Sequence, residues 1–211
     1  DTGVLEGRFN IAIDQAMVEE HQAGRIPDTI RFMRFPPTAL IGRHQALRQE
    51  VDVDHCRSHG IGIVRRITGG GAIYLDEGQL GWGLVFQRKA LGQPSLADVA
   101  SHICQAVAAG LQRLGVDARY RPRNDIEVDG RKISGTGGFF DGDTLIYQGT
   151  VLVDMDPAAM VAALSVPRAK LEKRQLDSAA QRVVTLCELP GPATPGLSAS
   201  QHAIPEAFSE R

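Results

Sequence analysis

The sequence predicts an α+β domain with mixed or antiparallel sheets packed with helices. Two tight hairpin signals, Asp129-Gly130 and Asp141-Gly142, lie in the middle of the chain, so consecutive strands there are expected to pair antiparallel. Helical patterns are separated by runs of strands instead of alternating with single strands, which disfavours a Rossmann fold. The 211 residues, of which 43% are hydrophobic, suffice to bury the core of one full-sized domain.

In the first part of the chain we expect a long helix, three strands and a short helix. The segment from Asn10 to Gly24 predicts an amphipathic helix, because it has Ile13, Ala16, Met17 and Glu20 at helical spacing and ends at a glycine. Asp52 is expected to cap a short helix that Gly60 ends. Apolar and β-branched runs predict strands at Thr29–Phe35, Ala39–Gly42 and Ile61–Arg65.

Further along, Ser95 and Asp98 resemble a capping box, and apolar residues then repeat at helical spacing up to Gly115, which predicts a helix. A last core helix is expected from Asp156-Pro157 through Leu164. Proline-rich sequence then divides the chain into a domain of residues 1–188 and a Pro-rich C-terminal tail or linker of residues 189–211. The strands expected in this part are Ala72–Tyr74, Leu80–Phe86, Asp125–Val128, Lys132–Ser134 and Thr144–Val153.

Composition and charge exclude several classes of protein. A charged fraction of 23% and a net charge of -2 are ordinary globular values, which exclude a disordered chain and give no overall attraction to nucleic acid or to an anionic membrane. No apolar run approaches the ~20 residues that span a bilayer, and residues 1–8 lack the pattern of a signal peptide. We therefore expect a cytoplasmic protein that binds neither nucleic acid nor membranes.

The cysteines and histidines argue against a disulfide framework and against a zinc site. Cys56, Cys104 and Cys187 are widely spaced and form no Cys-x-x-Cys pair. Only His55 and His59 have the i, i+4 spacing of metal ligands. Without a third ligand nearby, a solvated helix face is the preferred interpretation of this pair.

A first glycine cluster, residues 65–72 (Arg-Arg-Ile-Thr-Gly-Gly-Gly-Ala), lies between two expected strands. Three consecutive glycines let the backbone approach a ligand and turn its amides toward an anion, and two arginines add donors for a carboxylate or phosphate. A flexible surface loop with a solvated arginine pair explains the same composition. The segment is not a Walker loop, because no Gly-Lys-Ser/Thr follows.

A second cluster surrounds the Asp129-Gly130 turn. The hairpin is expected to bring Asn124, Asp125 and Lys132 close enough to act on one ligand, with the carboxylate available to Mg²⁺ and the ammonium to phosphate. A cross-strand ion pair between Asp125 and Lys132 is the alternative interpretation.

Together these segments resemble the lipoate-protein ligase family in order and spacing. The motifs are Arg-Arg-x-x-Gly-Gly-Gly-Ala-x-Tyr-x-Asp at 65–76, Arg-Asn-Asp-Ile at 123–126, Lys-Ile-Ser-Gly at 132–135 and Gly-Thr-x-Leu at 149–152. The resemblance extends to residues 10–14, 36–45 and 182–183 and covers nearly all of residues 8–190. It implies a biotin/lipoate protein ligase-like catalytic domain.

The resemblance also implies a two-step reaction. Lipoate and ATP, with Mg²⁺, form lipoyl-AMP, and a lysine of a lipoyl carrier domain then takes the acyl group as an amide. Carried over by position, Lys132 is the expected catalytic residue, and Asp125 is the expected ligand of Mg²⁺. The lipoyl group is expected at Arg66, Gly69, Gly70, Gly71, Ala72 and Tyr74, and the nucleotide at Asn124, Asp125, Ile126, Ser134, Gly135, Thr136, Gly149 and Thr150.

Three departures from the family pattern put the identity of the acid in doubt. Leu75 and Gln148 stand where the family commonly has His, and Gly81-Trp82-Gly83 replaces an Asn-x-Ser. The sequence also offers no sizeable C-terminal accessory domain, so we expect a separate accessory subunit. The alternatives are an octanoyl or lipoyl transferase that relays the acyl group through a cysteine, and a noncatalytic lipoyl-binding subunit.

Overall fold

A six-stranded antiparallel sheet forms the centre of the computed structural model, which describes residues 1–92, 95–164, 182–189 and 195–209. The hairpins at Asp129-Gly130 and Asp141-Gly142 are confirmed, and both glycines have the positive φ, 74° and 59°, that such turns require. In spatial order the strands are β1 (Thr29–Met33), β5 (Gln79–Gln87), β9 (Thr144–Leu152), β8 (Arg131–Asp141), β7 (Asp125–Val128) and β6 (Arg119–Arg121).

A smaller mixed sheet consists of β3 (Gly62–Arg65), β2 (Thr38–Ile41) and β4 (Ile73–Leu75). Its central strand β2 runs parallel to β3 and antiparallel to β4. A turn from Asp76 to Gly78 leads from β4 to β5, and these two strands belong to different sheets. Asp154, just after β9, donates its backbone N–H to the Gly78 carbonyl at 2.8 Å, which holds the turn against the large sheet. The confirmed fold class is therefore α+β, with one antiparallel and one mixed sheet.

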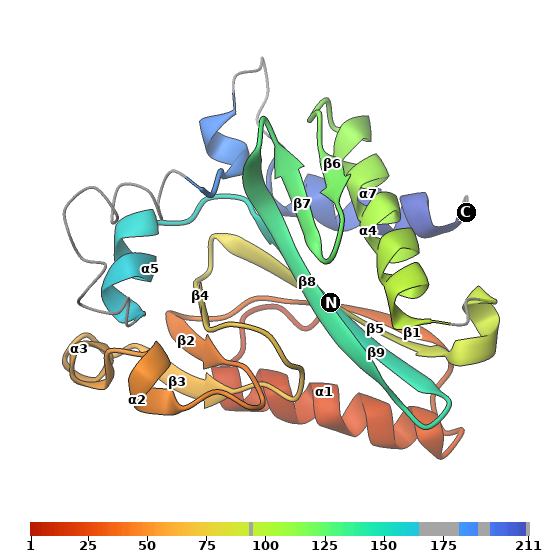
Figure 1. Ribbon diagram of the computed structural model, residues 1–211, viewed down its shortest axis with the longest axis horizontal. Coiled ribbons are helices and arrows are strands. Elements are labelled where there is room, and N and C mark those ends of the chain that lie inside the picture. The colour runs from red at the N-terminus through yellow and green to blue at the C-terminus, as the bar shows by residue number, and fades with distance from the viewer. Residues whose placement is uncertain (93–94, 165–181, 190–194, 210–211) are drawn as a thin grey trace.

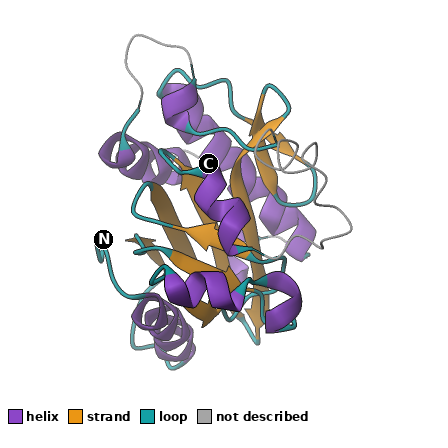
Figure 2. Ribbon diagram, turned by 90° about the vertical axis from the view of Figure 1, so that its left-hand side faces the viewer, coloured by secondary structure: helices purple, strands orange, loops and turns teal. Residues whose placement is uncertain are grey.

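Helices cover both faces of the strands (Figures 1 and 2). Ser95, Asp52 and Asp156 cap their helices as predicted, each accepting a backbone N–H two or three residues ahead. In Figure 1, α1 runs along the lower edge, and α4 and α7 lie together on the upper right. The helices are α1 (Gly7–Gln22), α2 (Leu47–Glu50), α3 (Val53–Ser58), α4 (Leu96–Arg113), α5 (Pro157–Ala163) and α7 (Leu197–Ser209), with short 3₁₀ turns at Arg88–Leu91 and Leu186–Glu188.

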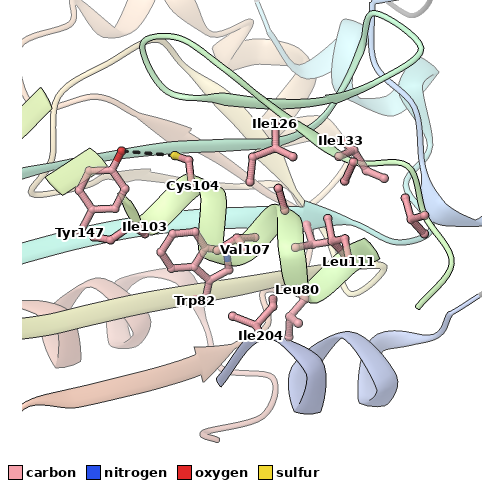
Figure 3. Close-up of a cluster of buried hydrophobic side chains, with 14 of the residues drawn as sticks. Leu80, Trp82, Ile103, Cys104, Val107, Leu111, Ile126, Ile133, Tyr147 and Ile204 are labelled. Atoms are coloured by element: carbon pink, nitrogen blue, oxygen red, sulfur yellow. Dashed lines mark hydrogen bonds between the residues drawn. The ribbon is translucent and has the colours of Figure 1, made fainter. Parts of the chain in front are cut away.

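The main hydrophobic core lies between α4 and the large sheet (Figure 3). The predicted stripe of α4 supplies Ile103, Val107 and Leu111, all at most 1% exposed. Trp82 of β5 and Tyr147 of β9 meet this stripe, and their rings lie 6.3 Å apart. Large fully buried side chains of this kind contribute about 1.5–3 kcal/mol each to folding. The sheet and α4 therefore share one buried hydrophobic core.

Helix α1 is confirmed, but the residues that predicted it by their helical spacing do not form its buried face. Ala16 is exposed and Ile13 and Met17 are only half-buried, whereas Asn10, Ile11, Asp14, Val18 and His21 are buried. Polar residues occupy this face because specific partners satisfy them. His21, for example, contacts Thr144 Oγ1 and Asp28 Oδ1, both at 2.9 Å. Hydrophobicity alone therefore selected the wrong side of the helix.

The segment after Leu189, expected to be a tail or linker, contains helix α7 within its described residues 195–209. Ala203, Ile204 and Ala207 are buried there, and α7 packs against α4. The contact is close because Gly110 of α4 has no side chain, and a Cβ there would lie 2.9 Å from the Ala203 carbonyl oxygen. Tertiary packing overrides the proline signal, and Pro205 lies inside the helix. Residues 190–194 and 210–211 lie outside the described residues.

Within the described part of the chain, no helix has both the length and the apolar character needed to cross a membrane.

The contact between Gly149 and Trp82 provides a test of this packing. A Cβ at Gly149 would lie 2.2 Å from Trp82 Cζ2, and Trp82 is fully buried. We therefore expect Gly149→Ala to lower the free energy of unfolding by about 1–3 kcal/mol, measured by urea denaturation. Gly137→Ala on the neighbouring strand is the control, because no atom lies within 4 Å of the position that a Cβ would take there. Equal losses of unfolding free energy in both variants would contradict the close contact between Gly149 and Trp82.

Candidate functional site

A cavity of about 350 Å³ lies between the large sheet and the small sheet. Its walls combine an apolar surface with a few polar groups, as in most small-molecule sites. The apolar residues include Ile11, Met33, Phe35, Leu40, Leu75, Met155, Met160 and Leu164. Of the residues predicted from the sequence, Arg66, Gly69, Gly70, Gly71, Ala72, Tyr74, Asn124, Lys132, Gly135, Thr136, Gly149 and Thr150 line it. The structure thus brings both glycine clusters to one pocket.

The pocket exists because the inner face of the central strands carries few side chains. Side chains alternate between the faces of a strand, so Gly81 and Gly83 of β5 share one face with Gln148 and Thr150 of β9, their partners in the ladder. On β8, Gly137 pairs with Gln148 and lies on this same face. The Met33 side chain lies over Gly81 and Gly83, whereas no atom lies within 4 Å of a Cβ position at Gly137, so a ligand can lie against the backbone there.

The glycine loop is braced from inside by Arg66. Its guanidinium donates to the Leu40 carbonyl at 3.1 Å, to the Gly69 carbonyl at 2.7 and 3.2 Å, and to the Gly71 carbonyl at 2.7 Å. Burial lowers the pKa of this side chain. Arg66 therefore lines the pocket as predicted, but its hydrogen bonds shape the loop.

Gly70 is required at the turn of this loop. Its φ is +97°, and a Cβ there would lie 2.9 Å from an Arg66 nitrogen. Arg65, the other arginine of the predicted pair, donates to the carbonyls of Gly42, Arg43 and Gln45 at 2.8 to 3.1 Å. Both arginines are thus engaged with backbone carbonyls, while Arg65 is exposed and Arg66 is half-buried.

Lys132 at the start of β8 lies across a glycine. A Cβ at Gly135 would lie 2.6 Å from Lys132 Nζ, so the ammonium rests on the strand where Gly135 has no side chain. Nζ is 2.7 Å from Asp125 Oδ1, across the predicted hairpin. Lys132 also lines the pocket, and 38% of its side chain is exposed. The ion pair and the ligand-facing position, posed as alternatives from the sequence, are both present.

Asn124 is pinned beside this pair. Its side-chain amide donates to the Thr136 backbone carbonyl at 2.9 Å. Its backbone carbonyl accepts from the Thr136 backbone N–H at 2.9 Å and from the Thr136 hydroxyl at 3.0 Å. Arg123, just before it, has a φ of 110°, which is costly for a residue with a side chain. The loop between β6 and β7 is thereby held in one conformation at the edge of the pocket.

Ile126 and Ser134 do not line the pocket, contrary to the expectation that they contact a nucleotide. They are paired across β7 and β8 and therefore share a face of the sheet. That face is turned to the core, and both side chains are fully buried. Asp125 and Gly135 form the neighbouring pair on the opposite face, next to the Lys132 ammonium. Asp125 itself does not line the pocket, and its ion pair with Lys132 connects it to the pocket wall.

A buried polar network, absent from the predicted site, forms part of the pocket wall. Asp14 of α1 accepts from Arg31 Nη1 at 2.7 Å and from the side-chain amide of Gln148. Thr68 donates its hydroxyl to Gln148 Oε1 at 3.2 Å. Burial raises the pKa of Asp14 to about 6, against the opposing effect of the Arg31 guanidinium. The sequence signal for this network was the pair of Asn10 and Asp14, an amide and an acidic residue at i, i+4 spacing in α1.

The three cysteines lie outside the pocket. Cys56 is buried and its thiol lies 3.6 Å from the Ala163 carbonyl, while Cys187 is exposed at the edge of the core. Cys104 is fully buried under the sheet, with its sulfur 3.3 Å from Thr136 Oγ1. Burial raises the pKa of the Cys104 thiol, which opposes formation of a nucleophilic thiolate.

A metal ion beside Lys132 would have the carboxylate of Asp125 as its neighbouring protein ligand. Among the described residues, no group of three or more His, Cys, Asp or Glu is placed to hold a metal ion. Mg²⁺ commonly takes only one or two carboxylates and completes its coordination with water and phosphates. Asp125 is such a carboxylate, and its buried Oδ1 has no hydrogen-bond partner in the described chain apart from the ion pair with Lys132. His55 and His59 stack on each other with ring centroids 4.0 Å apart.

The raised pKa of Asp14 makes a prediction about stability. Its folded pKa of about 6 exceeds the ordinary 3.8, so the native state holds this proton more tightly than the unfolded chain. The stabilisation is complete below the unfolded pKa and is lost as pH rises through the folded pKa. We expect the free energy of unfolding of the wild type, minus that of Asp14→Asn, to fall between about pH 4 and pH 6. Urea titrations at several pH values measure it, and a flat or rising difference would contradict the shift.

Curated relatives include both ligases and transferases. The chain is 28% identical to the octanoyltransferase LipM of Geobacillus kaustophilus, over 90% of this chain and 77% of that protein. It is 32% identical to the lipoate-protein ligase LplJ of Bacillus subtilis, over 88% of this chain and 54% of that protein. The chain therefore spans about half the length of that ligase.

Solved structures have the same fold. A chain from the study of the bipartite lipoate protein ligase and its E2 lipoyl domain from Thermoplasma acidophilum matches with a TM-score of 0.84 at 26% identity, over 99% of this chain and 82% of that one. Lipoate-protein ligase A bound with ATP matches with a TM-score of 0.82 at 26% identity, over 100% and 85%. The family model of the lipoyl protein ligase A/B catalytic domain matches residues 6–209. With its glycine loop, its lysine and its pocket in place, the chain belongs to the lipoyl protein ligase A/B catalytic domain family.

Proposed function

We propose that the chain is the catalytic domain of a lipoate-protein ligase, which activates lipoate with ATP to lipoyl-AMP and transfers the lipoyl group to a lysine of a lipoyl carrier domain. The observation that carries this proposal is the Lys132 ammonium resting on Gly135 beside an apolar pocket. An anion bound there meets a fixed positive charge, and an alkyl chain can continue into the apolar part.

The first step brings two anions together. A carboxylate oxygen of lipoate attacks the α-phosphorus of ATP, and the bond from that phosphorus to the pyrophosphate oxygen breaks. Lys132 supplies a preorganised charge where negative charge accumulates, and the pinned Asn124 adds a polar group nearby. Asp125 keeps the ammonium in place through the ion pair. Mg²⁺ bound to the phosphates, with Asp125 as its protein ligand, would offset further charge.

The second step is an aminolysis. The amine of the acceptor lysine attacks the acyl carbon of lipoyl-AMP, the bond to the AMP oxygen breaks, and the amine loses a proton as the amide forms. Lys132, which is partly exposed, faces this carbonyl as well. The partial exposure of Lys132 matters because the acceptor lysine must reach the acyl carbonyl from solvent. The rest of the pocket must at the same time keep water away from the adenylate.

Solved structures of the family support ATP as a ligand and a lipoyl carrier domain as a partner. One neighbour was solved with ATP, and another was studied as a bipartite enzyme with its E2 lipoyl domain. We therefore include ATP and a lipoyl carrier domain in the proposal, together with a second protein subunit that assists the activation step.

An octanoyl transferase is the second candidate, because LipM relatives match over most of their length. A cysteine relay requires a thiolate next to the acyl carbonyl. None of the cysteines lines the pocket, and Cys104, which contacts the lining residue Thr136, is fully buried with a raised pKa. This arrangement favours activation by adenylation.

The decisive experiment is mass spectrometry of a lipoyl carrier domain after incubation with the protein. Lipoate, ATP and Mg²⁺ are supplied together and then omitted one at a time, and octanoyl carrier protein replaces lipoate and ATP in a parallel reaction. A ligase gives a mass shift that requires ATP, whereas a transferase acts without it. Preformed lipoyl-AMP is supplied in a further reaction. Modification from lipoyl-AMP but not from lipoate plus ATP would mean that the activation step needs a second protein subunit.

The role of Lys132 predicts a specific loss. Lys132→Ala should lower the rate of adenylation, measured by pyrophosphate release, by a factor of about 100 to 1,000, because the charge is needed mainly in the transition state. Gly135→Ala keeps the lysine but places a Cβ where the ammonium lies, so we expect a smaller loss in the same direction. Near wild-type adenylation in Lys132→Ala, with an unchanged melting temperature, would remove Lys132 from the mechanism.

The positions of the cysteines predict that none is a nucleophile. We expect a variant with Ser or Ala at Cys56, Cys104 and Cys187 to retain ATP-dependent ligation, because adenylation involves no thioester. Mass spectrometry of the wild-type protein should detect no covalent acyl adduct. A hydroxylamine-sensitive acyl group on any of the three would assign the protein to the transferases.

A further inference from the structure

One row of residues bears on which acid the pocket selects. This inference rests on the proposed function. This row crosses four strands on the pocket face of the large sheet, in the order Arg31, Gly83, Gln148 and Gly137. Residues paired across a ladder share a face. The two glycines leave only Arg31 and Gln148 with side chains in this row.

Both side chains converge on Asp14 of α1. All five N–H groups of Arg31 have acceptors, namely Asn10, Asp14 and Thr2, so Arg31 has no donor left for a ligand. Asp14 is 1% exposed, and Arg31 offsets its charge. This end of the pocket is therefore polar and carries little net charge.

The amide of Gln148 is held in one orientation. Its nitrogen donates to the Asp14 carboxylate, and its oxygen accepts from the Thr68 hydroxyl. The reverse orientation would set the amide oxygen against the carboxylate. The second N–H of the amide has no acceptor among the described residues, and Gln148 lines the pocket. One fixed donor thus remains available to a ligand.

This donor lies beyond the apolar section, away from Lys132. The ammonium rests on Gly135, and Gly137, the neighbour of Gln148, is two residues further along β8, roughly 7 Å away. Ile11, Leu40 and Leu75 also line the pocket and pack together in one hydrophobic cluster. An acid whose carboxylate meets Lys132 would therefore pass its alkyl chain through the apolar section and bring its distal part to Gln148.

We propose that Gln148, held by Asp14 and Thr68, selects carboxylic acids that carry a neutral heteroatom on the distal part of a medium-length chain, such as the dithiolane sulfurs of lipoate, over a plain alkyl chain. An alkyl end leaves the amide donor buried without a partner, which costs more than the absence of a favourable contact. Pockets with a committed hydrogen-bonding group discriminate in this way against analogues that lack the partner atom.

The test compares three free acids by isothermal titration calorimetry: lipoate, 8-hydroxyoctanoate and octanoate. The second and third differ by one oxygen and have nearly the same shape. The wild type should bind both lipoate and 8-hydroxyoctanoate at least about tenfold more tightly than octanoate. In Gln148→Met, which keeps the length of the side chain and removes the donor, both ratios should fall toward one.

Two further variants make the comparison specific. Gln15→Met carries the same change on the exposed side of α1, one residue after Asp14, and should keep the wild-type ratios. Thr68→Val removes the hydroxyl that holds the Gln148 carbonyl and should lower the ratios in part, which serves as the second test if Gln148→Met fails to fold.

The outcomes separate this inference from the proposed function. Equal binding of the three acids by the wild type, or unchanged ratios in folded Gln148→Met, overturns the selectivity and leaves ligation untouched. Binding of none of the acids overturns the acyl site itself. Selective binding with ATP-independent modification of the carrier overturns the ligase assignment while the selectivity stands.

Discussion

The site depends on the absence of side chains along one face of the central strands. Gly81, Gly83 and Gly137 sit on the pocket side of β5 and β8, and the Lys132 ammonium occupies the space above Gly135. A pocket against a sheet normally has to be made by moving another layer away, which sacrifices buried area. Here part of the floor is backbone, at Gly137, so the sheet remains packed against α4 on its other face while this face stays open to a ligand.

Charge in the pocket is divided between fixed and available groups. Arg31, Arg65 and Arg66 are engaged by backbone carbonyls and by buried acceptors, and of the three only Arg66 lines the pocket. Among the described cations of the pocket wall, Lys132 alone combines partial exposure with a single carboxylate partner. Because an ion pair at a partly exposed site is weak, an incoming anion can compete for the ammonium without disrupting the fold.

The ligases and transferases of this family share a scaffold, so the chemistry is decided by which nucleophile and which anion the site can hold. In this chain, Thr136 separates Cys104 from the pocket and holds Asn124 through its backbone and hydroxyl. The same residue thus keeps the thiol in the core and fixes the polar edge of the site. The polar network around Asp14 adds a second constraint at the opposite end, where the ligand chain would finish.

Local sequence signals determined much of this protein. The caps at Asp52, Ser95 and Asp156, the two hairpins and the α4 stripe depend on neighbouring residues, and they were predicted correctly. The resemblance to the family assigned the motif lysine and several glycines to the site, and these residues line the pocket. Tertiary structure alone decided which face of α1 is buried, that Ile126 and Ser134 point into the core, and that the segment after Leu189 contains a helix against α4. It also assembled Asp14, Arg31, Thr68 and Gln148, which come from a helix, two strands and a loop far apart in the sequence. Such choices depend on whether distant polar groups find partners and on how a ladder registers its pairs, and neither can be read from a local pattern.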